Sequence, residues 1–240
     1  MPGPEGNDAL ARAWALADAG DYGASLTEAE RMIALEPDLA EAHSARGWAL
    51  ENLGPERLTD ASDAYGEALR LDPEDLWAKE GLSNVLRRLG RPAEADALCV
   101  EVVQDARRRP TNDPELLEIR GWCEYRLGRL AEAEASFRRA LDLDPAIVSV
   151  RLDLALVLLC QMRADEASSA YAAAIAGARG SGGMTGVVAA ALDDLVEALG
   201  ERDEVRRDPA AESARHLLRS FGSQSPAASS AAGTLPMGST

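Results

Sequence analysis

Few side chains in this sequence of 240 residues have the type and spacing needed for acid–base or nucleophilic catalysis. Its two histidines, His43 and His216, are far apart in the chain, and neither has cysteines or carboxylates near it at metal-ligand spacing. A glycine-rich stretch, 180–183, lacks the lysine and the serine or threonine of a phosphate-binding loop. Because catalysis needs several such groups to converge, we expect a protein that is not an enzyme and that binds neither a cofactor nor a metal.

The charge of the chain narrows the classes of partner. Forty-one acidic residues against 25 basic ones give a formal net charge of -16, which argues against nucleic acid and anionic membranes. The longest apolar stretch, 147–160, is interrupted by Arg151 and Asp153, so no membrane insertion is expected. Three widely spaced cysteines indicate a reducing compartment, and the N-terminus shows no signal-peptide pattern. We therefore expect an acidic, cytoplasmic protein.

An internal repeat shows which elements position the remaining candidate residues. The chain reads RGWALENLG at 46–54 and RGWCEYRLG at 120–128. Gly20, Gly54, Gly90 and Gly128 follow one another at intervals of 34, 36 and 38 residues. Apolar or small residues at helical spacing precede each glycine, which is a common helix stop, and a second helical pattern follows it. The sequence therefore predicts a series of helical hairpins.

The second helix of each hairpin carries a small, a bulky and a small residue at spacings of four and then three. Ala61, Tyr65 and Ala68 form one such set. This spacing places the three side chains on one helix face, where the small residues allow close helix packing. We expect the bulky residue to reach the first helix of the next hairpin.

These units resemble the tetratricopeptide repeat family, whose repeats of about 34 residues form helical hairpins. The resemblance implies an all-α fold: a right-handed α-solenoid of tetratricopeptide-like hairpins with a C-terminal helical cap. The expected parts are an N-terminal tail (1–5), five repeats (6–39, 40–75, 76–113, 114–147 and 148–181), capping helices (182–222) and a disordered tail (223–240).

In this family the inner stripe of the first helices is the usual peptide-binding surface. Three of the four tryptophans occupy the same position of that stripe. They could form a ladder that takes apolar anchors of a partner, because tryptophan is enriched at binding hot spots. The alternative is that the rings pack into the seams between helices. The predicted groove residues are Trp14, Trp48, Glu51, Asn84, Arg87, Glu118, Trp122 and Tyr125.

The fifth repeat differs, since its inner stripe of Leu152, Leu156 and Leu159 is apolar throughout. The capping helices could cover this stripe, or it could be an interface. We therefore expect a non-catalytic adaptor or scaffold whose concave groove binds a protein or peptide segment with apolar anchors and basic flanks. The alternative is a structural subunit that self-assembles through the fifth repeat and the cap. The sequence leaves the oligomeric state open.

Overall fold

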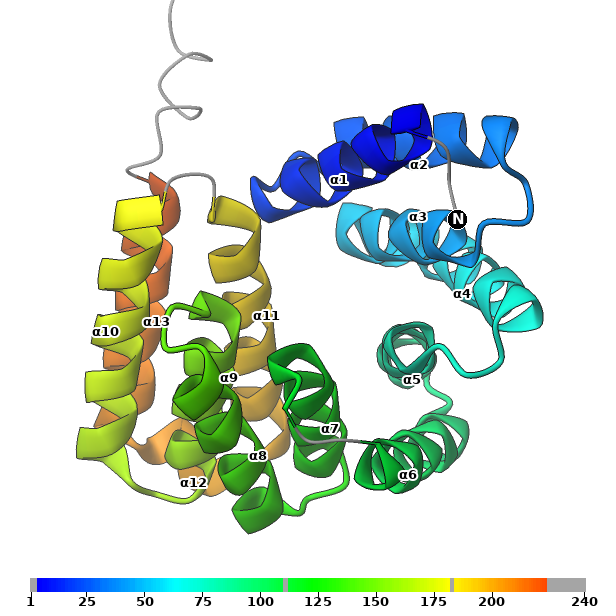
Figure 1. The fold of residues 1–240 in the computed structure, drawn as a ribbon. Coiled ribbons are helices and arrows are strands. Elements are labelled where there is room, and N and C mark those ends of the chain that lie inside the picture. Colours follow the sequence, from blue (N-terminus) through cyan, green and yellow to red (C-terminus); the bar gives the residue numbers. More distant parts are fainter. Residues whose placement is uncertain (1–3, 110–111, 182–183, 224–240) are drawn as a thin grey trace, which may run out of the picture.

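The structure is a computed structural model that describes residues 4–109, 112–181 and 184–223. In this part of the chain the regular elements are helices, and ten of them pair as five stacked hairpins (Figure 1). The predicted all-α solenoid is thus confirmed. The hairpins are α1 (Pro4–Asp18) with α2 (Tyr22–Leu35), α3 (Ala40–Leu53) with α4 (Leu58–Leu71), α5 (Leu76–Arg88) with α6 (Pro92–Arg108), α7 (Pro114–Arg126) with α8 (Leu130–Leu143), and α9 (Val148–Cys160) with α10 (Ala164–Ser181).

The turn within each hairpin is made by a residue in the left-handed backbone region. Gly20, Gly54, Gly90 and Gly128 have φ angles of 81°, 143°, 75° and 73°. The short 3-10 helix η1 (Pro55–Arg57) follows the second of them. In the fifth hairpin Met162 takes this position with a φ of 62°, although a side chain there is unusual. The repeat therefore continues through a turn that lacks its usual glycine.

Bulky side chains of the second helices bind successive hairpins together. Tyr65 of α4 is fully buried between the first helices of its own hairpin and the next. Its ring lies so close to Gly47 and Gly81 that a Cβ atom at either position would overlap it. Phe137 of α8 lies equally close to Gly121 of α7, the first helix of its own hairpin. The small and bulky positions of the repeat thus set the spacing between helices.

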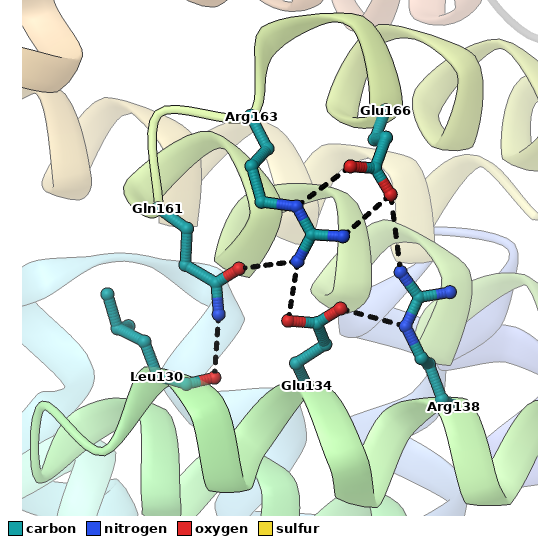
Figure 2. A network of polar contacts seen from close by, with 6 residues as sticks. All are labelled: Leu130, Glu134, Arg138, Gln161, Arg163 and Glu166. Carbon is teal, nitrogen blue, oxygen red and sulfur yellow. Dashed lines mark hydrogen bonds and ion pairs between the residues drawn. The ribbon is translucent and has the colours of Figure 1, made fainter.

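A network of polar side chains joins the fourth and fifth hairpins at the surface (Figure 2). Arg163 donates to Glu134 of α8 over 2.7 Å and to Glu166 of α10 over 2.7 Å. Arg138 donates to the same two carboxylates. Gln161 adds a hydrogen bond to the Leu130 carbonyl at 3.1 Å. These contacts fix the turn after α9 against the start of α8.

Three further helices fold back over the last hairpin: α11 (Thr185–Glu201), α12 (Asp203–Arg207) and α13 (Pro209–Ser223). Helix α13 packs against α10 and α11, while α11 packs against α9. Leu152, Leu156 and Leu159 are at most 2 % exposed, in one core cluster with Leu195 of α11 and Leu218 of α13. The leucine stripe is therefore buried within one chain. Residues 1–3 and 224–240 of the predicted tails lie outside the described residues.

Helix α11 also reaches the opposite end of the solenoid, where it contacts α1 (Figure 1). The Tyr22 hydroxyl donates to the carbonyl of Gly186 over 3.3 Å. A Cβ atom at Gly186 would overlap the backbone of 17–20, so the two segments touch through their main chains. The first and last parts of the solenoid are thereby joined into a closed arrangement.

Candidate binding groove

The inner side of the solenoid encloses a cavity of about 1450 Å³. Its walls come from the first helix of every hairpin, α1, α3, α5, α7 and α9, and from α11. All four tryptophans of the chain line it. Fourteen carboxylate side chains line it as well, against three arginines. The cavity therefore combines aromatic surface with a large excess of negative charge, and we call it the groove.

Six of the eight residues predicted from the sequence line this groove: Trp14, Trp48, Glu51, Asn84, Glu118 and Trp122. Two others lie outside its lining. Arg87 turns toward its own hairpin and bonds Asp96 of α6 at 2.5 Å. Tyr125 is 4 % exposed and packs behind Trp122, with 5.2 Å between ring centroids. Both side chains therefore face packing partners instead of the cavity.

Three of the indoles form a cluster in the half of the groove made by α1, α3 and α5. The Trp77 ring centroid lies 4.7 Å from that of Trp14 and 5.7 Å from that of Trp48, both edge to face. Such pairs are favourable beyond their buried area. All three side chains are partly exposed. Trp77 was absent from the predicted ladder, yet it stands seven residues before Asn84, which is two helical turns on the same face.

Trp122, the third member of the predicted ladder, is covered. It is 8 % exposed, and its Nε1 donates to Oδ1 of Asn84 over 3.0 Å. The guanidinium carbon of Arg126 lies 4.9 Å from the ring centroid. Arg126 in turn donates to Glu197 of α11 over 2.9 Å. Trp122 therefore packs between helices, as in the alternative to the ladder, while Trp14 and Trp48 keep exposed surface toward the groove.

Family models and solved structures agree on the nature of the repeat. Models of the tetratricopeptide repeat match residues 56–106 and 114–147. The chain is a tetratricopeptide repeat (TPR) protein. A thermophilic TPR protein of Thermus thermophilus is 26 % identical, with a TM-score of 0.60 over 78 % of this chain and 98 % of the other. The type IV pilus biogenesis factor PilW is 19 % identical, with a TM-score of 0.51 over 96 % and 99 %, and shares the fold alone. No curated protein sequence matches the chain.

Two features missing from the described part of this TPR chain bear on its chemistry. No helix there is both long and apolar enough to cross a membrane. Among the same residues, no group of three or more histidine, cysteine or acidic side chains could hold a metal ion. Acidic side chains nevertheless dominate the groove, so their electrostatics decide what it can bind.

Several carboxyl groups of the TPR groove hold their protons tightly. Burial raises the pKa of Glu51 to about 7, although Arg88 and the Tyr65 hydroxyl oppose the shift. Burial also raises the pKa of Glu118 to about 7 and that of Asp194 to about 7. The cause is the same in each case, since removal from water disfavours the charged form. The groove thus holds more carboxyl groups than its three arginines can pair, and burial favours the protonated form of several of them.

We expect this TPR protein to lose stability as the pH rises from about 4.5 to about 7. Glu51, Glu118 and Asp194 have raised folded-state pKa values, so between these pH values the folded chain binds more protons than the unfolded chain. Stability from this source is complete below the unfolded-state pKa and is lost as pH passes the folded-state value. Each group contributes up to roughly 3 kcal/mol to the free energy of unfolding that is lost across this pH range.

Urea unfolding at a series of pH values measures this slope, and Glu118→Gln should flatten it. Glu94 provides the control, because it is fully exposed and its pKa is lowered by a hydrogen bond from Arg91. Glu94→Gln should leave the slope between pH 4.5 and 7 unchanged. Stability that rises across this window would contradict the assignment of protonated carboxyl groups to the groove.

Proposed function

We propose that this TPR chain is a non-catalytic adaptor that binds a segment of a partner protein in its groove. The observation that carries the proposal is the cavity of about 1450 Å³, lined by the first helices and by indole rings with open faces. Indole rings supply large contact areas at small entropic cost, as at binding hot spots. The TPR fold supports a protein–protein interaction role, and the groove is the surface that we assign to it.

The chemistry of the groove favours a partner with apolar anchors and basic flanks. Trp14, Trp48 and Trp77 offer aromatic surface, while the carboxylates around them repel an acidic segment. We also propose a cytoplasmic location. Cys99, Cys123 and Cys160 are buried in the fold and form no disulfide, which suits a reducing compartment.

Site-specific crosslinking tests this function. A photoreactive amino acid at position 41, which is exposed and lines the groove, should capture the partner segment in cells. The same probe in place of Ala135, exposed on the second helix α8, is the control and should capture far less. Mass spectrometry then identifies the crosslinked segment.

Truncating the indoles should abolish this capture. Trp14→Ala with Trp48→Ala and Trp77→Ala removes the aromatic cluster, and hot-spot tryptophans cost at least about 2 kcal/mol each on truncation. Circular dichroism checks that the helices are retained. Capture that is equal at positions 41 and 135, or that survives the triple substitution in a folded chain, would sink the groove assignment.

A further inference from the structure

Each of the first three hairpins presents an indole and a carboxylate side by side to the groove. A tryptophan is followed three or four residues later by an acid, a spacing that makes the two side chains neighbours on a helix. Both members of each pair line the cavity, and the Trp77 ring contacts both of the other indoles. We call this set the indole–carboxylate recess. It consists of Trp14 with Asp18, Trp48 with Glu51, and Trp77 with Glu80.

In the fourth hairpin, an indole and a carboxylate together bind a side chain of the protein itself. Here Trp122 is followed four residues later by Arg126, whose guanidinium lies 4.9 Å from the indole centroid and 5.9 Å from that of Tyr125. The guanidinium is also paired with Glu197 at 2.9 Å, and the side chain is only 6 % exposed. One end of the groove is therefore filled by a guanidinium that stacks on an indole and pairs with a carboxylate.

The other end has the indoles and carboxylates but lacks that guanidinium. In the described part of the chain, cation–π contacts involve only the Trp122 and Tyr125 rings. The two remaining arginines of the groove are already engaged. Arg88 donates to the Glu51 carbonyl over 3.0 Å and lies 3.6 Å from its carboxylate, and Arg109 donates to the carbonyl of Glu74.

Two carboxyl groups of the recess are left without a cation of the chain. Among the described residues, neither Asp18 nor Glu80 has a basic nitrogen within 4.0 Å, and Glu80 accepts a hydrogen bond from Asn84. Burial, and to a smaller extent the nearby Glu51 charge, raise the pKa of Glu80 well above its usual range. A cation bound beside Glu80 would favour its ionised form. Its charge would replace the solvation lost on burial and would offset the repulsion from Glu51.

We propose that the indole–carboxylate recess binds an arginine side chain of the partner segment, in the way that the fourth hairpin holds Arg126. This inference rests on the proposed function of the groove. The guanidinium stacks on the open indole faces and donates to the carboxylates of Asp18 and Glu80. Arginine suits the recess better than an apolar anchor, because only a cation uses both halves of each indole–carboxylate pair.

Capped synthetic peptides test the proposal on the full-length wild-type chain. The probe is a peptide of alternating leucine and arginine, compared with versions that carry citrulline, lysine or glutamate at the arginine positions. Citrulline keeps the shape of arginine without its charge. We expect the arginine peptide to quench indole fluorescence and to bind at least about tenfold more tightly than the citrulline peptide. The lysine peptide should be intermediate, and the glutamate peptide should not bind.

Variants locate the contact within the groove. Glu80→Gln should weaken the arginine peptide about tenfold and leave the citrulline peptide unchanged. Glu115→Gln is the control, since Glu115 lines the groove on α7 and is not a member of the indole–carboxylate recess. Equal affinity for the arginine and citrulline peptides, an equal effect of both substitutions, or no binding of any peptide would overturn the arginine site. Crosslinking at position 41 would stand in each of these cases, so the two proposals fail separately.

Discussion

Replacing Gly81 with alanine will separate the second hairpin from the third and lower the free energy of unfolding by about 3 kcal/mol. The added Cβ atom would lie 2.6 Å from the hydroxyl oxygen of Tyr65 and 2.7 Å from Cε1 of its ring. That ring cannot move aside, because it is fully buried and also lies against Gly47. Its hydroxyl donates to Glu51 over 3.2 Å, and a shift would break this buried hydrogen bond as well.

The matched control is Gly66→Ala in α4, because a Cβ atom at Gly66 meets no atom within 4 Å. There the change should stabilise the chain by about 0.5–1 kcal/mol through helix propensity. Urea unfolding measures both effects. Most contacts in a solenoid are between neighbouring units, so the Gly81 variant should also unfold in two steps. A Gly81 variant as stable as the wild type would show that the hairpins are spaced by other contacts.

The hairpins were predictable because their signals are local. A glycine stops each first helix, and the small and bulky residues of each second helix recur in phase, so the packing of Tyr65 follows from spacing alone. The fifth turn shows the limit of this logic. Met162 adopts the same left-handed backbone conformation as Gly128. Its residue type does not indicate this, and only the period of the repeat places a turn there.

The position of α11 could not be predicted, because contacts between distant segments decide it. Periodicity predicts an amphipathic helix near Thr185, and the apolar stripe of the fifth repeat is one surface that the capping helices could cover, but nothing in the sequence indicates the contact with α1. In the structure it lies between α9 and α1 and brings Glu197 to Arg126. This contact between Arg126 and Glu197 holds the guanidinium over the Trp122 ring and fills one end of the groove. The repeat spacing places Trp122 in line with Trp14 and Trp48, but it cannot show that a distant helix helps to cover the ring.

A substitution at the contact between α11 and α1 should have the second large effect on the structure. We expect Gly186→Val to detach these helices and open the groove on that side. A Cβ atom at Gly186 would lie 2.9 Å from the Gly20 nitrogen and 3.0 Å from the Asp18 carbonyl oxygen. Backbone atoms cannot turn away as a flexible side chain can, so the helices must separate. Hydrogen exchange in the first turns of α11 should then accelerate by about tenfold or more.

Tyr22 reports the same event independently. Burial, with nearby Asp193, raises the pKa of Tyr22 to about 12, and its hydroxyl bonds Gly186. Once the helices separate, this tyrosine should titrate near pH 10, its ordinary value. Gly200→Val is the matched control in the same helix, because a Cβ atom there meets nothing within 4 Å. If the Gly186 variant kept both the slow exchange and the raised pKa, the closure would depend on other contacts of α11, of which those with α9 are the most extensive within the solenoid.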